Sequence, residues 1–301
     1  MRKRNLSERY RVLIRQYRDP PKGKSASADL YHELATVERL LIDHPPKLKT
    51  PDGRMVVRAK GLITPEEARA GADAKGLSRL RKLGTPECNR IRDDFKVIAV
   101  GDWADAIAER QKQKAESRRM VEDFTLDQNG YGSCGSEGIA GCIIGCERKQ
   151  GNPNVERLNA FRLYKYVNGG RDNGSSLPDN LAAAAEYGVP TETVSPRTRG
   201  WKEKITDEER EDALRHRLDE YWQVSNKEEL GTALLLGMFV YLGYAGHAFN
   251  AVDLVDDKRL VWHNSWGEEF GDNGFSTLLF DDVYWSYGVY AVRTALRPSV
   301  N

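Results

Sequence analysis

Apolar residues recur along this chain with two different periods, and the period changes near Gly237. Before that point, apolar positions three or four residues apart predict helices, because 3.6 residues make one helical turn. After it, apolar and polar positions alternate as they do in strands. The predicted helices cover 29–43, 103–119, 133–150, 154–167 and 179–187, with one short strand among them at 95–100. The predicted strands after Gly237 cover 238–242, 247–255, 260–264, 275–280 and 289–292. Helices followed by antiparallel strands predict an α+β fold.

Three more helices are predicted from their starting residues alone. Thr64, Thr206 and Asn226 each precede a Glu by three residues. This spacing is typical of a capping box, in which the first side chain and the Glu each bind a backbone N–H of the first turn. Pro65, directly after Thr64, also favours a helix start.

The predicted helix at 133–150 contains four glycines, at 135, 138, 141 and 145. Each costs about 1 kcal/mol relative to alanine in a helix interior. Close packing of neighbouring backbone against this small-residue face is the compensation we expect.

The charge of the chain changes sign near residue 120, although the total is only +1. Residues 1–120 carry 28 Lys and Arg against 17 Asp and Glu, whereas residues 121–301 carry 18 against 28. This division predicts a basic, mainly helical N-terminal region at 1–120 and a second domain at 121–301. The basic residues either solvate helical faces, dock on the acidic part, or meet a nucleic-acid or acidic protein partner.

Composition is that of a globular protein, with 40% hydrophobic and 30% charged residues. No apolar run approaches membrane-spanning length, so no membrane partner is predicted. The basic N-terminus leads into no apolar stretch, so no secretory signal is predicted. The four cysteines, at 88, 134, 142 and 146, lack the spacing of a disulfide framework, which favours a reducing, cytoplasmic setting.

Three side chains in two distant segments supply what a cysteine-nucleophile hydrolase needs. Cys134 lies where a loop enters a predicted helix, and the unpaired N–H groups and dipole of a helix start favour a thiolate there. His247, 113 residues later, would accept and return the thiol proton. Asn264 would orient the imidazole through its side-chain carbonyl. No cofactor and no metal is required by this chemistry.

An acyl-transfer site also needs donors for a developing oxyanion. The backbone N–H of Cys134 and the side-chain amide of Gln128, six residues earlier, are the candidates. Gly130 and Gly132 would let the intervening loop bend tightly.

At these positions the chain resembles the papain family of cysteine peptidases. The motifs are Gln128 followed by Gly132-Ser133-Cys134, then Gly246-His247-Ala248, and the run from Asn264-Ser265-Trp266-Gly267 to Phe275. The resemblance covers about residues 121–295, and nothing before them resembles the family's usual inhibitory propeptide. It implies a helical subdomain with Cys134, a β subdomain with His247 and Asn264, and a Trp266 that covers the His247–Asn264 hydrogen bond. It also implies a polypeptide substrate.

The chain departs from the family pattern at three points. Tyr131 replaces a disulfide cysteine of secreted relatives, as in bacterial and phage members, so a virion-associated location is an alternative to a cytoplasmic one. Gly135 replaces the bulky aromatic residue after the nucleophile, and we expect it to loosen the start of the helix. The 113-residue spacing to His247 is shorter than usual and implies trimmed loops.

The remaining cysteines and histidines receive structural interpretations. Cys142 and Cys146 share a helical face with apolar neighbours and lack a matching second pair, so core packing is favoured over metal binding. Cys88 is interpreted as an ordinary free thiol. His263 adjoins Asn264 on a strand and should therefore point to the opposite face.

The sequence thus predicts a cysteine peptidase that cleaves peptide or isopeptide bonds through Cys134, His247, Asn264 and Gln128. Two alternatives stay open. One is another acyl-transfer enzyme, an amidase or transglutaminase, on the same residues. The other is a catalytically weak scaffold whose basic N-terminal half binds nucleic acid or a particle component.

Overall fold

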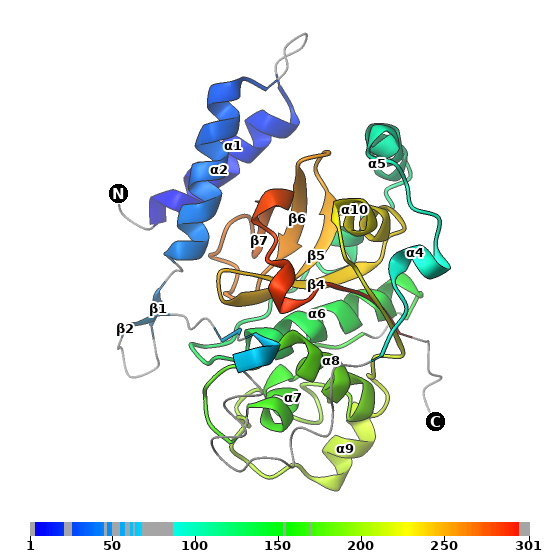
Figure 1. The fold of residues 1–301 in the computed structure, drawn as a ribbon. Helices are drawn as coiled ribbons and strands as arrows, with labels where there is room; N and C mark the ends of the chain where they lie inside the picture. Colours follow the sequence, from blue (N-terminus) through cyan, green and yellow to red (C-terminus); the bar gives the residue numbers. More distant parts are fainter. Residues whose placement is uncertain are drawn as a thin grey trace.

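The computed structural model describes residues 4–20, 26–44, 47–49, 55–57, 61–62, 64–67, 87–152, 155–168 and 170–294, with backbone alone at 4–5, 47–49 and 55–57. Within these ranges the chain forms an antiparallel six-stranded sheet with helices on both faces (Figure 1). The predicted α+β class is confirmed.

The sheet has the strand order β3-β8-β4-β5-β6-β7. Its strands are β3 (Glu220–Gln223), β4 (Phe239–Tyr244), β5 (His247–Leu254), β6 (Arg259–His263), β7 (Phe275–Leu279) and β8 (Tyr290–Arg293). The last five match the predicted strands to within two residues at either end. Strand β3 was not predicted, and it lies at the sheet edge beside β8.

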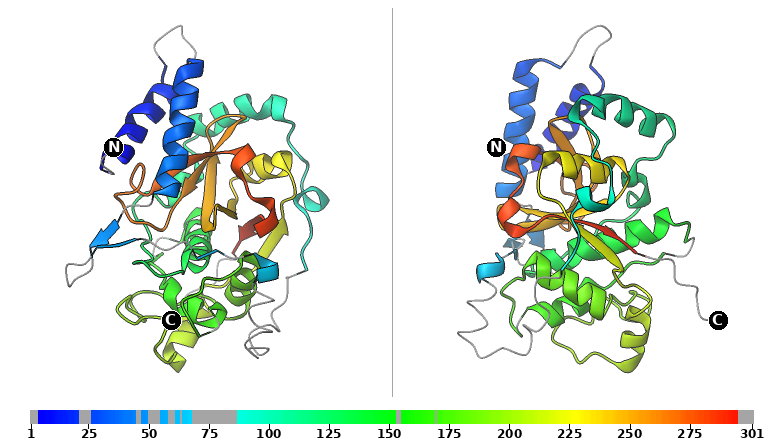
Figure 2. Two further views of the ribbon diagram at one scale, coloured as in Figure 1. Left: turned by 60° about the vertical axis from the view of Figure 1, so that its left-hand side comes forward. Right: turned by 45° about the vertical axis from the view of Figure 1, so that its right-hand side comes forward.

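Both faces of the sheet are covered, so β4, β5 and β6 are buried at every position. Alternate residues enter two separate cores. Val240 and Leu242 contribute to a core shared with α10 (Lys227–Leu235) and the N-terminal helices. Phe239 and Tyr241 contribute to a second core shared with α6 (Cys134–Lys149). Figure 2 shows helices on either side of the sheet.

The glycine face of α6 lies against the sheet, as the sequence predicts. A Cβ at Gly138 would lie 3.3 Å from the Cα of Phe249, and one at Gly145 would lie 2.2 Å from the Phe239 ring. The missing side chains therefore let the helix approach β4 and β5 closely. This packing fixes the position of Cys134, the first residue of α6, relative to β5.

Three helices complete the lower part of the molecule in Figure 1: α7 (Ala160–Val167), α8 (Leu177–Glu186) and α9 (Asp207–Ala213). The prediction of a helix from residue 154 is wrong for 155–159, because the Asn159 side chain caps a helix that begins at Ala160. The capping box predicted at Thr206 is present. At α10, Asn226 caps the helix as predicted, but Glu229 reaches back to the N–H of Ser225.

The N-terminal helices α1 (Arg4–Arg18) and α2 (Ala28–Asp43) form a hairpin that packs on β7 (Figure 1). At the contact, Glu38 of α2 is buried beside Arg259 of β6, with 3.4 Å between Oε1 and Nε. A short two-stranded sheet of β1 (Lys47–Lys49) and β2 (Met55–Val57) follows.

In the described residues 64–67 and 87–119, part of the prediction is confirmed and part is wrong. Thr64 and Glu67 make both hydrogen bonds of the predicted helix start. Residues 95–100 form no strand, because the Ile98 N–H donates to the Thr232 hydroxyl and Phe95 packs on Trp222 rather than extending the sheet. Helix α5 (Trp103–Lys112) ends at Lys112 and not at the predicted residue 119. Just beyond its end, Lys114 adopts a positive φ of 54°. A short helix, α4 (Ile91–Asp94), precedes it.

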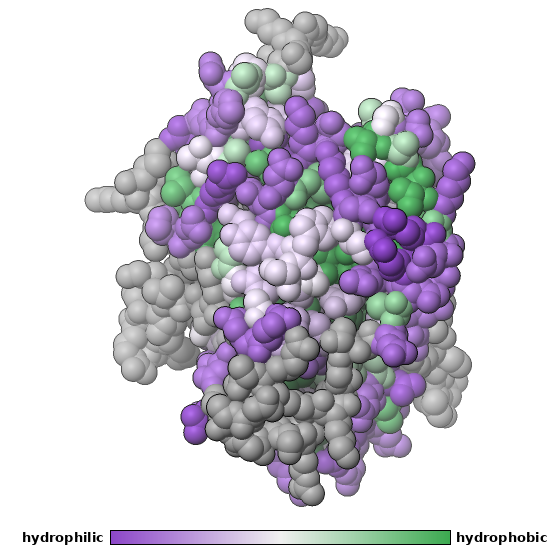
Figure 3. Space-filling view, viewed as in Figure 1, coloured by the Kyte–Doolittle hydropathy of each residue, from purple (hydrophilic) through white to green (hydrophobic). Residues whose placement is uncertain are grey.

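Within the described ranges, no helix combines the length and apolar character needed to span a bilayer. On the face shown in Figure 3, hydrophilic side chains predominate around a pale central area of intermediate hydropathy. Tyr284 and Trp285, which are about two-fifths exposed, belong to the large hydrophobic side chains on the surface.

Candidate active site

Gln128 and Cys134 lie at the two ends of one tight loop. Asn129 and Gly130 adopt positive φ angles of 48° and 81°, and the Tyr131 N–H closes the turn on the Gln128 carbonyl at 2.9 Å. The loop then enters α6 at Cys134. The predicted nucleophile therefore does stand at a helix start.

The Gln128 side chain is fully buried and held at both ends of its amide. Its Oε1 accepts a hydrogen bond from the Ser265 hydroxyl at 2.8 Å, and its Nε2 donates to the Tyr131 carbonyl at 2.6 Å. The backbone N–H of Gln128 also donates to the Ser265 carbonyl at 3.0 Å. These contacts connect the loop to the residue directly after Asn264.

His247 and Asn264 come together under an indole ring, as the resemblance implies. His247 begins β5, Asn264 follows β6, and the His247 Nε2 lies 2.6 Å from the Asn264 Oδ1. The ring of Trp266 stacks on the imidazole, with 4.1 Å between centroids and 27° between planes. All three side chains are buried, so their hydrogen bond is shielded from water.

Cys134 is next to the start of β5. Burial raises the pKa of its thiol to about 11, and backbone hydrogen bonds from Ala248 and Gly61 act in the opposite direction. The thiolate expected from the helix start is therefore not favoured in this state, because the sulfur has no exposure to water. Two residues thus lie within hydrogen-bond range of the sulfur: Ala248, which adjoins His247, and Gly61, far towards the N-terminus.

Gly61 and Leu62 pass directly over the thiol, a contact that the sequence did not predict. The Ser175 N–H donates to the Gly61 carbonyl at 2.8 Å, and the Leu62 N–H donates to the Gly246 carbonyl at 3.0 Å. Leu62 and Ser175 form a parallel β-bridge. This segment is therefore bound through its backbone between the helical side and the β side of the site.

The fit around Gly61 is tight on two sides. A Cβ at Gly61 would lie 2.0 Å from the Gly132 carbonyl oxygen, and one at Gly174 would lie 2.0 Å from the Gly61 carbonyl oxygen. Any larger residue at position 61 would have to displace the Gly132 backbone. Glycine at position 61 is thus what allows the segment to lie this deep.

The Leu62 side chain fills an apolar recess on the β side. It is 6% exposed, and a Cβ at Gly243 would lie 2.2 Å from its Cδ2. Tyr287 lies beside the same place, 3.3 Å from such a Cβ. The recess is therefore filled by the aliphatic side chain of Leu62.

Gly135 does not loosen the start of α6, contrary to the expectation from sequence. A Cβ there would lie 2.5 Å from the Asn180 Nδ2, so the Asn180 amide occupies the space of the missing side chain. Asn180 in turn accepts from the Ser136 hydroxyl at 2.7 Å and donates to the Ser175 hydroxyl at 2.8 Å. The Gly135 carbonyl accepts from Tyr241 at 2.7 Å. The helix start is tightly held.

The other predicted residues take structural positions. His263 is buried and stacks on Phe275, and burial lowers its pKa to about 3, with the Arg118 charge acting in the same direction. Cys142 and Cys146 are buried free thiols, and Cys88 is a half-buried one. Among the residues that the structure describes, no His, Cys, Asp and Glu side chains form a cluster fit for a metal ion.

No protein-family model and no curated protein matches the sequence. Solved structures do match the fold. Procathepsin L 3 of the Tenebrio molitor larval midgut is 11% identical, with a TM-score of 0.53, over 96% of this chain and 99% of that one. Procathepsin B S9 of Trypanosoma congolense is 12% identical, with a TM-score of 0.52, over 89% and 99%. The proform of the ragweed pollen cysteine protease Amb a 11 is 14% identical, with a TM-score of 0.51, over 98% and 96%.

The sheet, the helix α6 packed on it and these matches define an α+β protein with a helical side and a β side. The chain has the papain-like fold, that of the cysteine proteases to which it is structurally similar over most of its length.

Proposed function

We propose that the chain is a cysteine peptidase that hydrolyses peptide or isopeptide bonds through Cys134, His247 and Asn264. The observation that carries the proposal is the buried His247–Asn264 hydrogen bond under Trp266, with the helix-starting Cys134 hydrogen-bonded to the backbone of Ala248, the residue after His247. A fold needs no such set of polar and reactive side chains for stability alone. The papain-like fold supports the same reaction class.

In the proposed acylation, the Cys134 sulfur attacks the carbonyl carbon of the scissile bond. With Nε2 of His247 bonded to Asn264, Nδ1 is the ring nitrogen that takes the thiol proton. The same nitrogen then gives this proton to the leaving amine as the carbon–nitrogen bond breaks. The product is a thioester on Cys134.

The oxyanion that forms on attack would be bound by the Cys134 backbone N–H and the Gln128 amide. A water molecule then attacks the thioester, with His247 as base, and the acid product leaves with regeneration of the thiol. Trp266 excludes other water from the His247–Asn264 bond.

We also propose that the protein exists in a latent form. Gly61 and Leu62 hold the backbone positions that an extended substrate would take, and Cys134 is fully buried beneath them. The three matched structures described above are proforms and match both parts of the chain, which supports assigning 1–120 at least in part to inhibition. Binding of nucleic acid by this basic region is the competing proposal.

The test is turnover of fluorogenic peptides with an aliphatic residue at varied positions, using the full-length parent, Gly61→Val and Gly61→Val/Cys134→Ser chains. We expect the parent to be slow, Gly61→Val to be at least tenfold faster, and Cys134→Ser to abolish the gain. Gly101→Val is the matched control, because a Cβ there meets no atom within 4 Å.

If Cys134 of the Gly61→Val chain is alkylated but the chain hydrolyses no peptide, the peptidase proposal is contradicted. The catalytically weak scaffold would then be favoured. Turnover that depends on an added amine acceptor would identify an acyltransferase instead.

A further inference from the structure

Arg197 joins the two elements that carry the proposed oxyanion donors. Its Nη2 donates to Glu137 Oε1 at 2.7 Å and its Nη1 to Glu137 Oε2 at 3.3 Å, while Nη2 also donates to the Asp127 carbonyl. Glu137 lies one turn after Cys134 on α6, and Asp127 directly precedes Gln128. We propose that Arg197 is a positioning residue that sets the distance between the Gln128 amide and the Cys134 N–H. The inference rests on the proposed peptidase function.

The contacts of Arg197 with Glu137 and the Asp127 carbonyl form a brace, and the burial of Glu137 favours them. Glu137 is fully buried, so without a cation its carboxylate would be an uncompensated charge within one helical turn of the nucleophile. Burial raises the pKa of Glu137 and Arg197 opposes this increase. A bidentate arginine–carboxylate pair is both strong and directional. Glu137 therefore keeps the guanidinium in the one orientation that also reaches the Asp127 carbonyl.

Apart from the short loop that joins them, the two donors are attached to different sides of the site. Gln128 is bonded to Ser265, which follows Asn264 after strand β6, through both its backbone N–H and its side chain. Cys134 belongs to α6. The Arg197 side chain contacts both the Asp127 backbone and Glu137. An error of about 1 Å in such a site costs on the order of 100-fold in rate.

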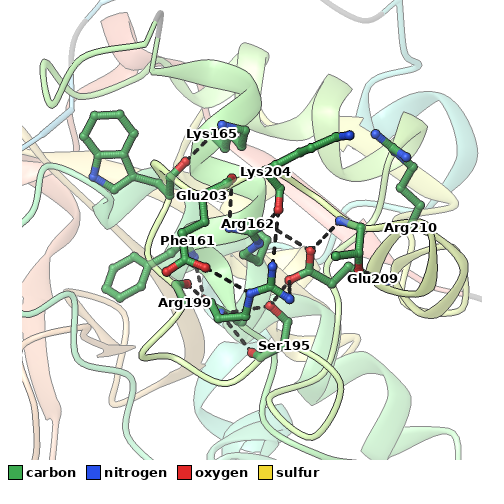
Figure 4. Close-up of polar contacts among 12 residues, drawn as sticks. Phe161, Arg162, Lys165, Ser195, Arg199, Glu203, Lys204, Glu209 and Arg210 are labelled. Atoms are coloured by element: carbon green, nitrogen blue, oxygen red, sulfur yellow. Dashed lines mark hydrogen bonds and ion pairs between the residues drawn. The ribbon is translucent and has the colours of Figure 1, made fainter.

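The loop that carries Arg197 is itself anchored on both sides. Asn159 donates to the carbonyls of Ser195 and Pro196 at 2.9 and 3.2 Å. Arg162, paired with Glu209 at 3.0 Å, donates to the carbonyls of Gly200 and Lys204 at 2.8 and 2.9 Å (Figure 4).

Glu209 also accepts from the Ser195 hydroxyl at 2.5 Å (Figure 4). The Arg162–Glu209 pair is buried on both sides, so it forms a rigid base for the loop. The guanidinium of Arg197 further lies 4.5 Å above the Phe161 ring of α7. The brace is thus fixed by the helical side of the molecule.

The test compares Arg197→Met and Arg197→Lys in the full-length Gly61→Val chain. We expect kcat/KM for a peptide to fall about 10- to 100-fold in Arg197→Met, less than the ~100- to 1000-fold expected for loss of an oxyanion donor. Most of the loss should be in kcat. Arg197→Lys keeps the positive charge but not the bidentate geometry of the guanidinium, so it should restore little activity. Arg210→Met, on an exposed pair with Asp207, is the matched control and should change nothing.

Two readouts separate positioning from general damage to the fold. Alkylation of Cys134 by iodoacetamide forms no oxyanion, so its rate should stay within about twofold of the parent rate. In a Gln128→Ala background, Arg197→Met should cause no further loss, because the donor it positions is already absent. Losses that multiply in the double variant, or unchanged kcat/KM in the single one, would overturn the inference.

A peptide aldehyde gives a readout that needs no turnover, since its adduct with Cys134 presents an oxyanion-like oxygen to the same donors. We expect Arg197→Met to bind it about 10-fold or more weakly. If the Gly61→Val chain hydrolyses no peptide, the proposed function fails. Equal aldehyde affinity of the Gly61→Val and Gly61→Val/Arg197→Met chains would separately overturn the role of Arg197.

Discussion

The N–H of Leu62 donates a hydrogen bond to the carbonyl of Gly246 at 3.0 Å, one residue before His247. The chain thereby places its own backbone across the residues proposed to carry out catalysis. Recognition through backbone hydrogen bonds with one side chain in a recess is the general mode by which grooves bind extended peptides. Because the segment is tethered, its effective concentration at the site is high.

Opening this segment should change the reactivity of Cys134. In the closed state the thiol has a pKa of about 11, so only about one molecule in ten thousand carries a thiolate at pH 7. We expect Leu62→Asp, which introduces a charge into the apolar recess, to raise the rate of iodoacetamide labelling at pH 7 by at least tenfold. Peptide mass mapping gives the rate for Cys134 alone.

In the parent chain, the rate of Cys134 labelling should instead keep rising as the pH increases towards 11. Val12→Asp, at an exposed position on α1, is the control and should leave the rate unchanged. An equal rate in parent and Leu62→Asp would show that the segment does not shield the thiol.

Gly135→Ala should destabilise the protein because the new methyl group would lie 2.5 Å from the Asn180 amide nitrogen. Overpacking of this kind costs about 1–3 kcal/mol. For a chain of this size we expect the Tm to fall by roughly 2–4 °C for each kcal/mol, measured by calorimetry, whereas Gly101→Ala should have little effect.

The clash can be separated from other causes with Asn180→Ala. If the Asn180 side chain is what the introduced methyl group meets, the double variant should lose less stability than the sum of the single variants. Strict additivity would contradict the assignment.

Asn264→Ala should lower kcat/KM in the Gly61→Val chain by about 10- to 100-fold, because a hydrogen bond to a charged imidazole is worth about 1.5–3 kcal/mol. The loss should be mainly in kcat, since Asn264 is proposed to orient His247 rather than to bind substrate. Asn89→Ala, on the surface, is the control. A change confined to KM would argue against the orienting role.

The residues of the site could be predicted from sequence because each motif is local. The loop from Gln128 to Cys134 and the run after Asn264 specify their own turns, and the antiparallel pairing of β5 with β6 brings His247 beside Asn264. The sheet followed from the same alternation, except β3, whose four residues are too few to show a period.

What the sequence did not reveal are contacts between backbones far apart in the chain. Gly61 meets Ser175, and Leu62 meets Gly246, through N–H and C=O groups of the kind that nearly every residue carries. Gly135 likewise led to the wrong expectation because the Asn180 amide that fills its space is 45 positions away. The Arg197 brace was missed for the same reason.

His263 provides a pH test that is independent of catalysis. Burial, reinforced by the Arg118 charge, lowers its pKa from 6.5 to about 3, so the folded state binds fewer protons than the unfolded state in this window. The stabilisation from the neutral ring is therefore fully present above about pH 6.5 and is lost as the pH falls towards 3. The loss is on the order of 3 kcal/mol by pH 4, at 1.36 kcal/mol per pH unit.

The variant His263→Asn removes this titration while keeping a polar side chain. It should be less stable than the parent at pH 7, because it leaves space beside Phe275, yet its stability should fall less between pH 6.5 and 4. Urea unfolding at several pH values measures the difference, with the exposed His32→Asn as the matched control. Parallel pH curves for parent and His263→Asn would mean that the ring is protonated normally in the folded protein. Acid sensitivity would then have to come from carboxylates and from the other histidines, which both chains share.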